Sequence, residues 1–253
     1  MQTTTLLGIA RSLAIYHVPG RGARSRRFYA PFVPAGGLCF DIGAHAGNRV
    51  RCFRSLGARV VAVEPQLEFA RLLRWMFGRD PLVTVIEAAL GAVHGSATLH
   101  VSALTPTVST LSPAWIERAR GDGSFRGVRW EPGPTVPVRT LDELIAQHGV
   151  PDFVKVDVEG MEEAVLSGLS QPVEALSFEY LGLAPDLATA CVQRLASLAD
   201  YRFNWSPGES MRLAGECWVD AERMRGRLPA ICARGGSGDV YARRATGAWP
   251  RTR

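Results

Sequence analysis

The chain has 253 residues, of which 47% are hydrophobic and 21% are charged, and its formal net charge at pH 7 is +5. This composition indicates an ordinary globular chain with a sizeable core and excludes a fibrous or disordered one. No apolar run approaches the roughly 20 residues that a membrane span needs, and the five cysteines form no C-x-x-C pair, so we expect a soluble, cytoplasmic protein with reduced thiols.

Residues 1–35 are expected to form a short N-terminal helix and a basic extension. Apolar residues recur through residues 1–16 at helical spacing, and Arg21, Arg24, Arg26 and Arg27 follow closely. The basic residues are almost all arginine, with Lys155 as the only lysine, a bias typical of GC-rich genomes. We therefore interpret the positive charge as a solvated surface, with an anionic partner at the arginine cluster as the alternative.

Residues 36–253 are expected to form one α/β domain, with a mostly parallel twisted sheet and helices on both faces. Strand-like and helix-like segments alternate from residue 36 onward, which is the pattern of such a sheet. Strands are predicted over residues 38–42, 59–63, 83–87, 97–101, 153–158, 175–180, 201–205 and 239–243, and helices over 48–56, 67–77, 161–169 and 187–199. Another helix begins at Thr140, which forms a capping box with Glu143.

The segment over residues 102–137 is rich in Ser, Thr, Gly and Pro and is predicted to be an inserted loop. Loops of this length in a compact domain are usually lids or binding elements. We expect part of it to close over a substrate, with Thr107, Ser109, Thr110, Trp115 and Trp130 as candidate contacts. The alternative is an ordinary surface loop whose tryptophans pack in the core.

The turn after the first strand has Asp41 at the strand end, followed by Gly43 and Gly47. Gly43 allows a tight turn beside a ligand, and Gly47 allows the next helix to start close to the sheet. The turn lacks the G-x-G-x-x-G pattern, and Asp41 would repel a pyrophosphate. A cationic ligand fits better, with N–H groups at the helix start available to a carboxylate. A purely structural turn is the alternative.

An acidic residue ends each of the next two strands. Glu64 stands where nucleoside-binding folds of this type hold a ribose through a carboxylate, so we predict that role for it. Glu87 stands where the chain would pass an adenine ring, and a plain exposed acid is an equal alternative there.

Charged side chains alternate with valines over residues 153–159. This period places Lys155, Asp157 and Glu159 on one side of the strand. A buried lysine needs carboxylate partners, and we expect Asp157 and Glu179 to supply them. These carboxylates are predicted to orient or deprotonate a substrate, or to help bind a divalent metal cation. A buried ion pair that positions the strand end is the alternative.

Together these segments resemble the FkbM family of methyltransferases. The matching motifs are D-I-G-A-H-A-G at residues 41–47, V-A-V-E-P at 61–65, V-R-T-L-D-E-L at 138–144, D-F-V-K-V-D-V-E-G-M-E at 152–162 and V-L-S-G-L at 165–169. The similarity covers roughly residues 36–181, and the K-V-D-V-E-G run is its most specific part. It implies a Rossmann-like, seven-stranded methyltransferase fold, S-adenosylmethionine as methyl donor, and O-methylation of a small metabolite or sugar.

By this similarity, the first turn would line the methionine end of the donor, and Asp157 and Glu159 would face the transferring methyl group. The candidate cofactor-binding residues are Asp41, Gly43, Ala44, His45, Gly47, Asn48, Glu64, Pro65, Glu87 and Ala88, and the candidate catalytic residues are Lys155, Asp157, Glu159 and Glu179. His45 departs from the family pattern, since many relatives have asparagine there. It either contacts the donor's carboxylate or only fills the turn.

Three other functions remain open at the level of sequence. An NAD-dependent oxidoreductase would share the architecture, but the missing glycine pattern and Asp41 disfavour it. An RNA methyltransferase would suit the net charge, but no N/D-P-P-Y/F motif follows the fourth strand, so nucleic acid is not the expected partner. A non-catalytic protein could keep the cofactor pocket as a scaffold for binding a partner.

Overall fold

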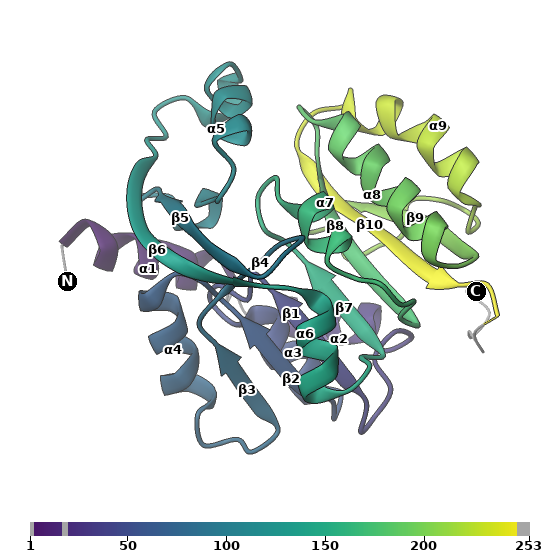
Figure 1. Ribbon diagram of the computed structural model, residues 1–253, viewed down its shortest axis with the longest axis horizontal. Helices are drawn as coiled ribbons and strands as arrows, with labels where there is room; N and C mark the ends of the chain where they lie inside the picture. Colours follow the sequence, from purple (N-terminus) through teal and green to yellow (C-terminus); the bar gives the residue numbers. More distant parts are fainter. Residues whose placement is uncertain (1–2, 17–19, 247–253) are drawn as a thin grey trace.

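The computed structural model describes residues 3–16 and 20–246. Its centre is a seven-stranded sheet with the strand order β3-β2-β1-β7-β8-β10-β9 (Figure 1). The strands are β1 (Leu38–Ile42), β2 (Arg59–Val63), β3 (Val83–Ile86), β7 (Phe153–Val156), β8 (Ala175–Leu181), β9 (Tyr201–Pro207) and β10 (Ser237–Arg244). Neighbours pair in parallel except at β10, which is antiparallel to β8 and β9. The predicted Rossmann-like α/β fold is confirmed.

Helices cover both faces of this sheet. One face carries α2 (Arg21–Tyr29), α3 (Asn48–Ser55) and α4 (Leu67–Phe77), and the other carries α6 (Leu141–His148), α7 (Glu162–Ser167), α8 (Pro185–Leu198) and α9 (Ala221–Cys232). Side chains alternate between the two cores, so that Cys39 packs with residues of α2 and α3 while Phe40 packs with residues of α6 to α9. Because both faces are covered, all five residues of β1 are buried.

A second sheet, with the order β4-β6-β5, corrects the loop predicted over residues 102–137. Its strands are β4 (Ala89–Leu90), β5 (Gly95–Val101) and β6 (Glu131–Arg139), and the same segment also contains α5 (Pro113–Arg120) and two short 3-10 helices, η1 (Pro106–Val108) and η2 (Gly123–Phe125). The sequence pattern predicted a loop here because β6 contains several prolines, which are rare within strands. They are tolerated because β4 pairs only with Val138 and Arg139, so most of β6 has one free edge.

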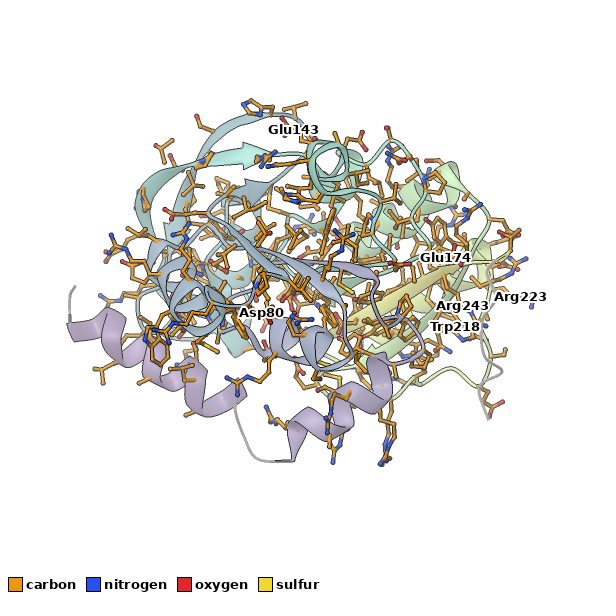
Figure 2. All side chains as sticks on the ribbon, turned by 90° about the horizontal axis from the view of Figure 1, so that it is seen from below. Asp80, Glu143, Glu174, Trp218, Arg223 and Arg243 are labelled. Carbon is orange, nitrogen blue, oxygen red and sulfur yellow. The ribbon has the colours of Figure 1, made fainter. Side chains whose placement is uncertain are left out.

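The N-terminal helix α1 (Thr3–Tyr16) packs against η1 and lies over the turn that follows β1. Arg11 donates hydrogen bonds to the carbonyl oxygen of Leu104 (3.2 Å) and to Oγ1 of Thr105 (3.3 Å). Ser12 is buried, and its Oγ lies 3.4 Å from Nε2 of His45. Figure 2 shows α1 and α2 along one side of the molecule. None of the helices within residues 3–16 and 20–246 is both long and apolar enough to span a bilayer.

Candidate functional site

A cavity of about 210 Å³ lies at the C-terminal ends of β1, β2, β7 and β8. We call it the acidic cavity, because seven carboxyl groups line it against two permanently charged side chains, Arg49 and Lys155. The carboxyl groups are those of Asp41, Glu64, Asp157, Glu159, Glu179, Glu209 and Asp239. This excess of acidic groups is suited to a cationic ligand.

Asp41 stands at the end of β1 and is 2% exposed. Its Oδ2 atom has no hydrogen-bond partner among the residues that the structure describes, and burial raises the pKa of its carboxyl group to about 7. Gly43 has a φ of 84°, and a Cβ atom there would collide with the carbonyl oxygen of Asp157. The first turn therefore brings the ends of β1 and β7 into backbone contact, which only glycine allows.

Glu64 directly follows β2 and is 2% exposed. Its Oε2 accepts a hydrogen bond from the backbone N–H of His45 (2.9 Å), and its Oε1 accepts one from the backbone N–H of Gln66 (2.8 Å). Burial raises its pKa to about 7. Gln66, which the sequence did not single out, also lines the cavity and accepts a hydrogen bond from the hydroxyl of Ser109. Glu64 thus ties the first turn to the end of β2.

Most residues predicted to bind the donor line the acidic cavity: Asp41, Gly43, Ala44, His45, Asn48, Glu64, Pro65 and Ala88. Gly47 does not, because it caps α3 and packs against Leu73 and Phe77 of α4. Glu87 does not either. β3 ends one residue earlier than predicted, and the carboxylate of Glu87 pairs at 2.8 Å with Arg74.

Lys155 is buried in β7, and its Nζ contacts Asp157 at 3.0 Å and Asp239 of β10 at 2.8 Å. Burial alone would lower its pKa, but the two carboxylates raise it well above the ordinary value, so the ammonium stays charged. The expectation of Glu179 as the second partner is wrong. Asp239 is the second carboxylate partner of Lys155, because β10 lies beside β8 in the sheet. No local sequence pattern predicts this strand pairing.

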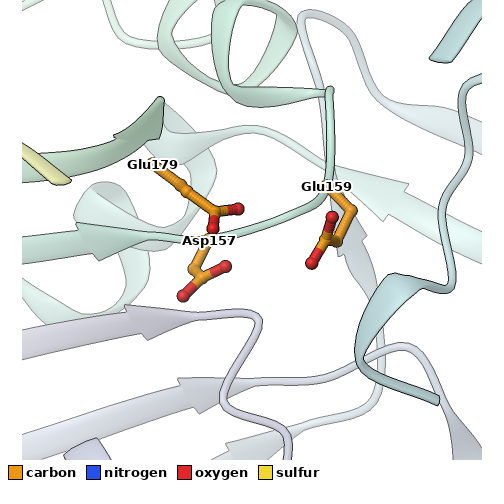
Figure 3. Close-up of side chains that lie close together, drawn as sticks. All are labelled: Asp157, Glu159 and Glu179. Carbon is orange, nitrogen blue, oxygen red and sulfur yellow. The ribbon is translucent and has the colours of Figure 1, made fainter. Parts of the chain in front are cut away.

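The carboxyl groups of Asp157, Glu159 and Glu179 point toward one another (Figure 3), and their oxygens lie within 4.8 Å of one another. Burial, followed by the nearby charge of Asp157, raises the pKa values of Glu159 and Glu179 well above their usual range. Burial also opposes ionisation of Asp157, but the Lys155 ammonium lowers its pKa on balance. The cluster therefore centres its negative charge on Asp157, and its oxygens are of the kind that a divalent cation prefers.

The turn after β7 sets the directions of Asp157 and Glu159. β7 ends at Val156, two residues earlier than predicted, and Glu159 has a φ of 54°. The buried carboxylate of Glu162 accepts hydrogen bonds from the backbone N–H groups of Val158 and Gly160, both at 3.0 Å. Strand alternation is therefore not the reason that Asp157 and Glu159 share one side. The turn held by Glu162 brings them together.

Three of the predicted substrate contacts, Thr107, Ser109 and Thr110, line the acidic cavity. Thr110 donates a hydrogen bond from Oγ1 to the carbonyl oxygen of Glu159 at 2.7 Å. Trp115 and Trp130 do not line the cavity. They pack in a separate core cluster, where Nε1 of Trp130 donates to a backbone carbonyl oxygen at 2.7 Å. For these two, the core-packing alternative holds.

Arg49 and Glu209 are lining residues that the sequence did not reveal. Arg49 is buried near the start of α3, and its Nη2 donates to both carboxylate oxygens of Glu209, at 2.9 and 2.8 Å. Glu209 lies in the turn after β9. A charged residue within a helix and another in a turn are usually solvated, so nothing in the sequence distinguished this pair.

The family model described as "Methyltransferase FkbM domain" matches residues 41–203, which is more than half of the chain. The matched range includes both acidic strand ends at Asp41 and Glu64 and the cluster around Asp157. A comparison with curated proteins finds no match.

Three solved structures of methyltransferases are similar to the chain at low sequence identity. The precorrin-6y C5,15-methyltransferase of Geobacter metallireducens GS-15 is 12% identical, with a TM-score of 0.47 over 88% of this chain and 86% of that one. A TehB-like S-adenosylmethionine-dependent methyltransferase of Corynebacterium glutamicum is 10% identical, with a TM-score of 0.45 over 92% and 94%. An O-methyltransferase of Bacillus cereus, in complex with S-adenosylhomocysteine, is 13% identical, with a TM-score of 0.42 over 96% and 91%. Because all three TM-scores are below 0.5, the assignment to a family rests on the match to the family model alone.

Proposed function

Because this chain belongs to the FkbM methyltransferase family, we propose that it transfers the methyl group of S-adenosylmethionine to a hydroxyl group on a small metabolite, a sugar or a secondary metabolite. Residues 36–253 would form the catalytic domain, and residues 1–35 would add α1 and α2 to it. One observation supports the proposal most strongly: the buried Oδ2 atom of Asp41, which has no hydrogen-bond partner among the described residues, lies in the lining of a cavity with an excess of acidic groups.

The donor's charges match this cavity. S-adenosylmethionine carries a sulfonium and an ammonium, and either cation would compensate Asp41, which lacks a partner for Oδ2 within the described part of the chain. The donor's single carboxylate suits the backbone N–H groups at the start of α3, beside Asn48. A dinucleotide would instead bring its pyrophosphate against Asp41, which disfavours NAD.

Glu64 is proposed to bind the ribose. Each of its oxygens accepts one backbone N–H, and each keeps a lone pair that can accept a hydrogen bond from a ribose hydroxyl. His45 is assigned a packing role. Its ring stacks on Phe69 at 4.0 Å between centroids, and burial lowers its pKa to about 4, so it adds no positive charge to the cavity.

Asp157 is proposed to accept the proton of the acceptor hydroxyl. Its pKa is lowered on balance by Lys155, which keeps it ionised, and Glu159 and Glu179 flank it within the cluster. When bound, S-adenosylmethionine supplies a methyl group that is already activated by the sulfonium. Methylation of the acceptor oxygen would release S-adenosylhomocysteine, and Asp157 would take up the proton that the hydroxyl group loses. Positioning and exclusion of water then carry most of the rate.

Calorimetric titration with S-adenosylmethionine and S-adenosylhomocysteine tests the proposal. The wild type should bind both ligands, and Asp41→Asn should bind S-adenosylmethionine at least about tenfold more weakly, which is about 1.4 kcal/mol. Glu87→Gln is the matched control: it also removes a carboxylate at a strand end, but outside the acidic cavity, and should keep its affinity within about twofold. Binding of NAD in place of both ligands would contradict the proposal.

A further inference from the structure

A second cavity, of about 500 Å³, lies between α2 and α3. Residues 20–26, at and within α2, form one wall, residues of α3 form another, and Glu209 and Met211 complete the lining. We call it the basic cavity, because its lining includes the five arginines Arg21, Arg24, Arg26, Arg49 and Arg51. The arginines of α2, the helix that follows α1 in Figure 2, therefore line a concave surface and do not only face solvent.

Most of the positive charge in the basic cavity has no acidic partner among the residues that the structure describes. Of the described residues in its lining, Glu209 alone is acidic, and that carboxylate is engaged in two hydrogen bonds from Arg49. The guanidinium groups of Arg24, Arg26 and Arg51 make no hydrogen bond or ion pair with any residue that the structure describes. Like charges around one concavity repel one another, so an anion placed among them would be stabilised.

The basic cavity adjoins the acidic cavity, since Asn48, Arg49 and Glu209 line both. The Arg49–Glu209 pair therefore stands at the junction between them. An anionic group would be repelled by the carboxylates on one side of the pair and attracted by the arginines on the other. A molecule that carries both an oxyanion and a hydroxyl group would be oriented by this polarity, with its oxyanion directed away from the acid cluster.

We propose that the basic cavity binds an oxyanion, a phosphate, sulfate or carboxylate, carried by the methyl acceptor. This inference rests on the proposed function, because it names the chemical class of the acceptor. Guanidinium groups present paired N–H donors that match the oxygens of such groups. The Arg49–Glu209 pair then separates the subsite for the oxyanion from the site of methyl transfer.

The test measures oxyanion binding to the wild type and to two variants by calorimetry at low ionic strength, with inorganic pyrophosphate and citrate as probes. Arg24→Gln combined with Arg51→Gln removes two guanidinium groups from the basic cavity. Arg27→Gln is the control, because Arg27 is also exposed on α2 but does not line the cavity. The wild type should bind at least one probe, the double variant at least tenfold more weakly, and the control within twofold. Preference for pyrophosphate or for citrate distinguishes a phosphate-type from a carboxylate-type acceptor.

The inference is overturned if the wild type binds neither probe, or if Arg27→Gln weakens binding as much as the double variant. It is also overturned if a single-stranded RNA oligonucleotide displaces the bound probe at a lower concentration than the probe itself, because the cavity would then serve a polymer. Titration of the same samples with S-adenosylhomocysteine separates the two levels of the account. If S-adenosylhomocysteine binds but neither oxyanion does, only the inference about the acceptor is wrong. If S-adenosylhomocysteine does not bind, both the proposed function and the inferred acceptor class are wrong.

Discussion

Burial raises the pKa of Asp41 to about 7, so the charge of its carboxyl group changes near neutral pH. A cationic ligand favours the ionised carboxylate, and binding should therefore release a proton below pH 7. The affinity for S-adenosylmethionine is expected to rise by about eightfold from pH 6 to pH 7.5, which is the gain in ionised fraction for one group with a pKa of about 7. Calorimetry across this range measures it.

The same titration on Asp41→Asn provides the control for this pH dependence. The amide cannot ionise, so the variant should show a clearly flatter dependence, with the remainder assigned to Glu64, whose pKa is also raised to about 7 by burial. An affinity that is constant from pH 6 to pH 7.5 in the wild type would show that no proton is released and that Asp41 does not face the cation.

Replacing Asp157 should separate catalysis from donor binding. Asp157→Asn removes the proposed base but leaves Lys155 its second carboxylate partner, Asp239, at 2.8 Å, so the fold should persist. Turnover is expected to fall by about 10²- to 10⁴-fold, the usual contribution of a general base, while the affinity for S-adenosylhomocysteine stays within about threefold. Glu163→Gln, an exposed acid on α7, should change neither. Equal turnover of both variants would exclude Asp157 as the base.

At this scale the sequence located the residues that stand at the ends of predicted strands, such as Asp41, Glu64 and Asp157, because parallel strands deliver their C-terminal ends to one edge. It did not locate Asp239 or Glu209. These residues reach the cavity through β10 and through the turn after β9, and their proximity depends on strand order, which local patterns do not encode.

At the scale of elements, β1 and β2 were predictable because they are short, mostly apolar runs with glycine or proline close to each end, and their predicted limits agree with the structure. β6 and α9 were not predicted, because each contains residues that usually interrupt a strand or a helix. β6 carries prolines that are compatible only with its free edge, and α9 contains Pro229 and a glycine within the helix. Tertiary packing overrides the local preference in both.

The position of α1 over the first turn gives an element-scale prediction. A Cβ atom on Gly8 would collide with the carbonyl oxygen of Ala103 and lie 2.8 Å from Cγ of Pro106. Gly8→Val should therefore push α1 away from η1 and His45, at a cost of roughly 1–3 kcal/mol. We expect the affinity for S-adenosylhomocysteine to fall by about tenfold, as calorimetry would measure.

Ala10→Val is the matched control for this change, because Ala10 is exposed on the same helix and has room for the larger side chain. It should keep the affinity of the wild type. Equal effects of the two substitutions would mean that helix propensity, and not the contact between α1 and η1, was altered.

At the scale of the whole molecule, the net charge of +5 conceals two cavities of opposite sign. The sequence showed the arginine excess but favoured a solvated surface, since composition carries no information on concavity. The fold places α2 against α3, and Asn48, Arg49 and Glu209 line both cavities. Two neighbouring cavities of opposite charge orient a charged ligand more effectively than an evenly distributed positive charge would.

The most direct test of the account is a crystal structure of the protein with S-adenosylhomocysteine. We predict density in the acidic cavity, with the ribose hydroxyls on Glu64, the ammonium beside Asp41 and the sulfur directed toward Asp157. Density for the ligand away from these three carboxylates would contradict the claim that the acidic cavity binds the methyl donor.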